Sequence, residues 1–229
     1  MITMTQRMVA TPVTAISLSA ARLSIAGAVA FSVLVLALHF IRPELDPSWR
    51  FISEYAIGAF GWVMMLAFLS MAVSCAALFV AIRSQVAGIA GRIGMMLLLV
   101  VSVALIAAGT FTMDPVTATK DQLTTHGSLH GLASMVGVPG LPMAAVLISW
   151  GLARNAAWSS ERKRLIATSV LSLICLVAMF GYIGVTLPKA GGFGPGVMVG
   201  WFNRLLVLSY AVWLAAASWS AIKVREQSI

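Results

Sequence analysis

The chain has 229 residues, of which 60% are hydrophobic and only 10% are charged, and its mean hydropathy is +0.98. This composition excludes a water-soluble globular domain. The formal net charge of +8 would be compatible with a nucleic-acid partner. However, ten of the fifteen basic residues fall in one set of loops and chain ends of an otherwise apolar chain, a distribution that indicates membrane topology, so we expect no nucleic-acid binding.

Long apolar runs predict membrane-spanning helices, because about 20 residues cross the hydrocarbon core of a bilayer. Membrane strands are not expected, since they appear as alternating segments of about ten residues. Six runs meet this criterion: 18–41, 58–82, 91–113, 127–152, 165–187 and 199–222. The connections are short. We therefore predict an all-α polytopic membrane protein with one six-helix bundle over 18–222, an N-terminal tail (1–17) and a C-terminal tail (223–229).

The distribution of charge predicts how this bundle is oriented. Ten of the fifteen basic residues fall in the N-terminus, the second and fourth loops, or the C-terminus, which share one side of the membrane. By the positive-inside rule both tails are cytoplasmic, and we expect a multi-pass protein of the cell inner membrane. The outer side holds the remaining five basic residues: Arg42, Arg50, Lys120, Lys189 and Arg204. Five of the seven acidic residues share that side, which therefore carries mixed charge.

The most polar stretch, TMDPVTATKDQLTTHGSLHG, connects the third and fourth predicted helices. It contains Asp114, His126 and His130, and the two histidines are spaced to share one face of a helix. Glu54 and Arg204 are predicted at the same depth, at the outer ends of the second and sixth helices. A charge inside an apolar run usually faces a partner or a wet cavity. We therefore expect these five residues to form a pocket in the outer leaflet.

The fourth predicted helix contains two interior prolines, Pro139 and Pro142. Each removes a backbone hydrogen bond, which predicts a kink near residues 136–141. Irregular helices in membranes often flank a cavity, because the freed carbonyl groups need partners. His130, Ser134 and Gly137 follow one another down one face of this helix, as a stripe of polar and small residues.

One hypothesis for the pocket is a metal-dependent hydrolase acting on a lipid or lipid-linked substrate. Zinc enzymes commonly use three protein ligands and keep one position open for water. His126, His130 and Asp114 would be the ligands. Glu54 would act as the general base, and Arg204 would hold a phosphate or carboxylate group.

A second hypothesis, which we favour slightly, is a protein that binds or transports a membrane lipid or a lipid-like small molecule. In a third, the cluster is purely structural: Arg204 pairs with Asp114 or Glu54, and the histidines are interfacial.

Haem ligation is a further alternative. It would need His39 opposite a histidine of the fourth helix, and a chain with only three histidines disfavours a di-haem arrangement. Glu54 could also be a solvated loop residue paired with Arg50. The composition does not specify an oligomeric state.

Several short motifs resemble one family. These are ISEYAIGAFGW, the aspartate that ends the third helix, the histidines that open the fourth, and NR at the head of the sixth. Together they resemble the membrane family named domain of unknown function 998, over about residues 35–220. That resemblance implies a six-helix membrane protein and no established reaction. A looser similarity links the chain to ceramidase-like membrane hydrolases, in which histidines and an aspartate hold zinc. Those proteins typically have seven helices, and their third histidine has no match here.

Overall fold

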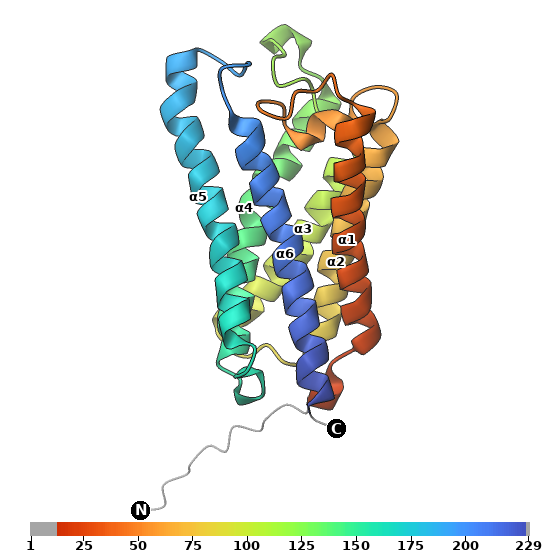
Figure 1. The fold of residues 1–229 in the computed structure, drawn as a ribbon, viewed down its shortest axis with the longest axis vertical. Coiled ribbons are helices and arrows are strands. Elements are labelled where there is room, and N and C mark those ends of the chain that lie inside the picture. Colours follow the sequence, from red (N-terminus) through yellow and green to blue (C-terminus); the bar gives the residue numbers. More distant parts are fainter. Residues whose placement is uncertain (1–12, 228–229) are drawn as a thin grey trace, which may run out of the picture.

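The computed structural model describes residues 13–227 and shows a single bundle of long helices (Figure 1). The helices are α1 (Leu18–Ile41), α2 (Gly61–Ile82), α3 (Gly88–Thr110), α4 (Thr125–Ala153), α5 (Arg162–Ala190) and α6 (Val199–Glu226). Each is long and apolar enough to cross a membrane. The described part of the chain contains no strand. The prediction of an all-α, six-span membrane protein is confirmed, with helix bounds within four residues of those predicted.

Four short 3-10 helices connect or precede these spans. They are η1 (Val13–Ala15), η2 (Ile52–Ala56), η3 (Lys120–Gln122) and η4 (Ala156–Trp158). The loops 42–60, 111–124 and 191–198 all lie at one end of the bundle, which we call the distal end (Figure 1). η1 and the last turn of α6 lie at the opposite end (Figure 1). The side of the membrane that the distal end faces stays a prediction.

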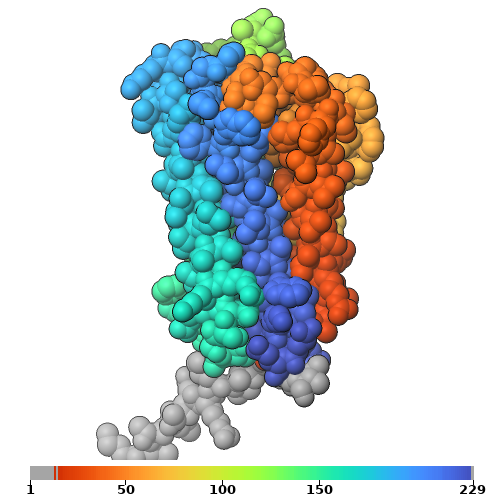
Figure 2. Space-filling view, in the orientation of Figure 1, coloured from red at the N-terminus to blue at the C-terminus, as the bar shows by residue number. Residues whose placement is uncertain are grey.

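The six helices are buried to very different degrees. In the apolar window of α6, 61% of the residues are buried, against only 17% in α5. The space-filling view shows α5 along one edge of the molecule, next to α6 (Figure 2). The outer surface of α5 carries large apolar side chains such as Ile174, Val177 and Val185. α5 is therefore the helix with the greatest share of its surface available to lipid.

Small and hydroxyl-bearing residues hold α1, α2 and α6 together. Ser74 Oγ donates to the carbonyl of Ser24 at 2.7 Å, and Ser218 Oγ donates to Ser24 Oγ at 2.8 Å. A Cβ atom on Gly27 would lie 2.6 Å from the carbonyl oxygen of Ser70, so only glycine permits this approach of α1 to α2. Such close contacts replace the hydrophobic effect as the cause of helix association in a membrane.

α4 continues without interruption through both of its interior prolines. Pro142 has no N–H group, so the carbonyl of Val138 has no donor within the helix. The hydroxyl of Tyr210, on α6, donates to that carbonyl at 2.6 Å. The proline thus creates a hydrogen-bond acceptor on α4 that a neighbouring helix satisfies.

Candidate functional site

A cavity of about 550 Å³ lies at the distal end between α4, α5 and the loop 111–124, and we call it the distal pocket. Apolar side chains form most of its wall, including Met113, Leu123, Met135, Met179, Phe180 and Ile183. Met135 on α4 and Phe180 on α5 expose half or more of their surface. Because both residues also line the cavity, it reaches the lipid-facing surface between α4 and α5.

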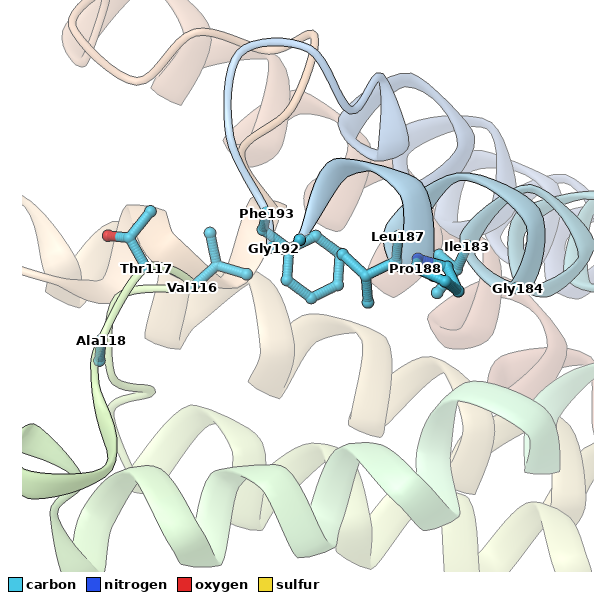
Figure 3. Close-up of a pocket in the computed structure, with 10 residues that line it drawn as sticks. Val116, Thr117, Ala118, Ile183, Gly184, Leu187, Pro188, Gly192 and Phe193 are labelled. Carbon is cyan, nitrogen blue, oxygen red and sulfur yellow. The ribbon is translucent and has the colours of Figure 1, made fainter.

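Two further cavities share walls with the distal pocket. A groove of about 650 Å³ lies between residues 116–118 and the distal end of α5 with the loop that follows it, with Val116 and Phe193 on facing sides (Figure 3). It shares Val116, Ala118 and Ile183 with the distal pocket. A smaller cavity of about 60 Å³ lies deeper in the bundle. The three together lead from the distal rim toward the interior.

His130 is the most deeply buried titratable side chain of the distal pocket, with 3% of its surface exposed. Its Nδ1 donates to two carbonyl oxygens at the end of α3, those of Ala108 at 3.0 Å and Phe111 at 2.9 Å. The neutral ring then carries its lone pair on Nε2. No described residue forms a hydrogen bond with Nε2. His130 therefore offers the pocket an acceptor.

Asn203 lies beside the pocket on α6 and is 7% exposed. Its Oδ1 accepts the backbone N–H of Ile52 at 3.1 Å, which fixes the orientation of the amide. The Nδ2 group has no acceptor within residues 13–227. The hydroxyl groups of Ser53 and Ser134 also line the cavity without a partner among those residues. We call Ser53, His130, Ser134 and Asn203 the polar set.

Asp114, which we predicted as a metal ligand, also lines the pocket but is engaged elsewhere. Its Oδ2 accepts the N–H of Thr124 at 2.9 Å, and its Oδ1 accepts the hydroxyl of Thr124 at 2.8 Å. Thr124 in turn caps α4 by accepting the N–H of Gly127. A Cβ atom on Gly127 would lie 1.9 Å from Asp114 Oδ2, so this arrangement needs glycine. The carboxylate positions the start of α4.

His126, the second predicted ligand, is exposed and packs edge-on against the ring of Phe111, with ring centroids 5.5 Å apart. It is not among the residues that line the distal pocket. Within the described chain, no three His, Cys, Asp or Glu side chains form a group that could hold a metal ion. The arrangement of Asp114, His126 and His130 therefore lends no support to the zinc hypothesis.

Glu54 is completely buried and accepts three hydrogen bonds. The donors are Arg50 Nη1 at 2.7 Å, the N–H of Phe51 at 3.0 Å and the N–H of Val116 at 3.1 Å. The predicted pairing with Arg50 is confirmed, whereas the prediction that this carboxylate is solvated is wrong. Because Val116 lines the pocket, Glu54 joins η2 to the pocket wall. Its oxygens face protein donors, and Glu54 itself is not part of the lining.

Arg204 lies at the distal end of α6 and is held by neutral acceptors. Its Nε donates to His39 Nε2 at 2.7 Å, and its Nη1 donates to the carbonyl of Arg50 at 2.6 Å. Nη2 donates to the hydroxyl of Tyr55 at 3.2 Å. The prediction that Arg204 pairs with Asp114 or Glu54 is wrong, because each of those carboxylates has other partners. Arg204 is also absent from the lining of the distal pocket.

The haem hypothesis also conflicts with this network. His39 Nδ1 donates to the carbonyl of Val35 at 2.7 Å, while its Nε2 accepts the hydrogen bond from Arg204. Both ring nitrogens are therefore engaged, and iron ligation by His39 would have to displace one of these bonds.

Two carboxyl groups in the first part of the distal loop 42–60, those of Glu44 and Asp46, have lowered pKa values. A hydrogen bond from the side chain of Arg42 lowers the pKa of Glu44 below its ordinary value. The backbone N–H of Ser48 lowers the pKa of Asp46 in the same way. Both carboxyl groups are therefore ionised at neutral pH.

Of the five predicted site residues, the structure brings Asp114 and His130 to one cavity. Glu54 lies behind its wall, and Arg204 and His126 point elsewhere. We did not predict Ser53 and Asn203 as site residues. Each adjoins a charged residue that we did select, and a neutral amide within an apolar run was the signal for Asn203.

No curated protein and no solved structure matches the chain. The similarity to ceramidase-like hydrolases is therefore not confirmed. The family described as Protein of unknown function (DUF998) matches residues 25–220, which is most of the chain and covers the greater part of each of the six helices. The chain therefore belongs to the DUF998 family of proteins of unknown function.

Proposed function

We propose that this protein binds a lipid or lipid-linked molecule in the distal pocket. The observation that supports this function is the combination of apolar walls with four polar groups that lack partners in residues 13–227. Binding sites for small molecules typically have this character, with few polar groups that fix the orientation of an otherwise apolar ligand. The proposed ligand places its head group against the polar set and its chain between α4 and α5.

The shape of the cavity supports entry from the bilayer. Met135 and Phe180 are exposed on the lipid-facing surface and also line the pocket. α5 is the least buried helix, so few contacts oppose its movement away from α4. An apolar chain can thus enter sideways without crossing water. The basic residues at the other end of the bundle support a site in the outer leaflet of the inner membrane.

Binding fits the described side chains better than metal-dependent hydrolysis. A hydrolase of that kind needs three ligands around one open position. Here Asp114 is engaged by Thr124, the N-cap of α4, and His126 packs on Phe111. The structural alternative explains Glu54 and Arg204, whose hydrogen bonds are all made with protein groups. It does not explain why His130 Nε2, Asn203 Nδ2 and the hydroxyl groups of Ser53 and Ser134 have no partner among residues 13–227.

The pocket can be filled by one substitution that the backbone tolerates. Gly131 lies in α4, lines the pocket and has no atom within 4 Å of a built Cβ position. Gly131→Leu should occupy the cavity and abolish retention of bound lipid. Gly181→Leu is the matched control, because Gly181 lies in α5 with equally open space and does not line the distal pocket.

The measurement is native mass spectrometry of the full chain purified in mild detergent, with identification of the retained lipid. We expect a specific lipid on the unmodified protein and on Gly181→Leu, and none on Gly131→Leu. Equal retention by all three proteins, or no retained lipid on any of them, would refute the proposal.

A further inference from the structure

The polar set restricts which head group the distal pocket can accept, an inference that rests on the proposed function. We infer that the ligand has an uncharged head group that presents a hydroxyl hydrogen to His130 Nε2 and an oxygen acceptor to Asn203 Nδ2. Acylglycerols with a free hydroxyl group belong to this chemical class. Phospholipids, whose head groups contain an ionised phosphate, do not.

The charges around the pocket argue against an anionic head group. None of the described residues that line the cavity is a lysine or an arginine. Three guanidinium groups lie at this end: Arg42 pairs with Glu44, Arg50 pairs with Glu54, and Arg204 is held by neutral acceptors. A phosphate removed from water needs a cationic partner or several donors to offset its desolvation, and the one obligate donor of the polar set is Asn203 Nδ2. Asp114, the one acidic residue of the described lining, would repel it.

The pocket also lacks a free carboxylate that could bind a cationic head group. Asp114 has both carboxylate oxygens engaged by Thr124, so neither is left bare for an ammonium group. Glu54 is completely buried behind the wall, and its oxygens accept three hydrogen bonds from protein groups. The polar set contains no carboxylate that could pair with an ammonium group.

The neutral groups specify a donor and an acceptor on the ligand. His130 is nearly completely buried, and its engaged Nδ1 leaves Nε2 as an acceptor that requires a ligand hydrogen. Asn203 is more than nine-tenths buried, and its engaged Oδ1 leaves Nδ2 as a donor that requires a ligand oxygen. Ser53 and Ser134 can act in either sense. An alcohol with a neighbouring ester oxygen satisfies both requirements.

Three lipids with identical acyl chains test this inference on the unmodified protein. They are 1,2-dioctanoylglycerol, its phosphate ester dioctanoyl phosphatidic acid, and trioctanoylglycerol, in which the hydroxyl is blocked. Each is titrated into the full chain in detergent at the same mole fraction, and bound lipid is counted by native mass spectrometry. We expect dioctanoylglycerol to bind at least tenfold more tightly than the other two.

Variants then test whether His130 Nε2 is the atom that accepts the hydrogen bond from the ligand hydroxyl. In His130→Asn the shorter amide can still donate to the carbonyls of Ala108 and Phe111, while the acceptor at Nε2 is lost. It should bind dioctanoylglycerol about tenfold more weakly, which corresponds to one lost buried hydrogen bond. His126→Asn is the matched control and should bind normally, since His126 is exposed and outside the lining. Ser134→Ala, expected to weaken binding severalfold, provides the same test if His130→Asn does not fold.

The outcomes separate this inference from the proposed function. Equal or tighter binding of phosphatidic acid would refute the inference that the head group is uncharged, but it would still be consistent with a lipid-binding site. Equal binding of trioctanoylglycerol would overturn the requirement for a hydroxyl. Failure of all three lipids to bind, together with no retained lipid on the purified protein, would refute the binding function itself.

Discussion

The hydroxyl of Tyr210 on α6 donates to the carbonyl of Val138 on α4 at 2.6 Å, and that carbonyl is the one that Pro142 leaves without a helical donor. In a membrane such a group has no water to bond with. We predict that Tyr210→Phe lowers the free energy of unfolding by about 1 kcal/mol. Thermal or SDS unfolding of the detergent-purified protein measures this change.

Pro142→Ala supplies the control, because an alanine at this position would restore the N–H donor to the carbonyl of Val138. In that background Tyr210→Phe should have much less effect, so the two substitutions should be coupled in a double-mutant cycle. Additive effects would show that the Tyr210 hydrogen bond does not compensate for the proline.

The two Arg–Glu pairs of the loop 42–60 should contribute very differently to stability. Glu54 is completely buried, and Glu54→Gln would leave Arg50 without its charged partner. We predict that it destabilises the fold by about 3 kcal/mol, as removal of one member of a buried ion pair does. Glu44, the partner of Arg42, is exposed, so Glu44→Gln should leave the unfolding midpoint unchanged. Similar midpoints for the two variants would contradict the burial of Glu54.

Position 204 requires a guanidinium group, because Nε, Nη1 and Nη2 of Arg204 donate to three separate acceptors on α1, the loop after it and η2. A lysine supplies one ammonium group and cannot reach all three. We predict that Arg204→Lys lowers the free energy of unfolding by about 2 kcal/mol. Arg92→Lys, at an exposed position of α3, is the control and should be neutral. A stable Arg204→Lys variant with lost lipid binding would instead place Arg204 in the binding site.

Two glycines one turn apart on α4 should respond in opposite directions to alanine. At Gly127 the added methyl group would meet the Asp114 carboxylate and disturb the cap made by Thr124, so we predict that Gly127→Ala destabilises by about 1–2 kcal/mol. At Gly131 the space is open. Gly131→Ala should stabilise by about 0.5–1 kcal/mol through helix propensity. Chemical unfolding of both variants tests the pair, and equal changes would argue against contact between Asp114 and Gly127.

The predicted orientation can be tested with single cysteines and a membrane-impermeant maleimide on intact cells. Thr117 is exposed in a distal loop, and Ser159 is exposed in the loop between α4 and α5 at the opposite end. With cytoplasmic tails, Thr117→Cys should be labelled and Ser159→Cys protected until the cells are lysed. The background is the protein with Cys75 and Cys175 replaced. The reverse pattern would place the distal pocket on the cytoplasmic side.

Apolar runs were enough to predict the six helices, because a bilayer requires each span to be long, apolar and internally hydrogen-bonded. That requirement acts along the chain, so it can be recognised without knowing which helices are neighbours. The same logic placed Asp114, His130 and Glu54 at one depth, and all three lie at the distal end.

Only the tertiary structure decided which polar groups form hydrogen bonds with other protein groups and which are left without a partner. Arginine and glutamate are common in catalytic sites, which is why we selected Arg204 and Glu54. In the structure, however, Arg50 donates a hydrogen bond to Glu54, and His39 on α1 accepts one from Arg204. Ser53 and Asn203 are neutral residues that we did not select from the sequence, yet both line one cavity from different elements. Depth in a membrane follows from hydropathy along the chain, whereas the direction of a side chain and its hydrogen-bond partner depend on how the helices rotate and pack against each other.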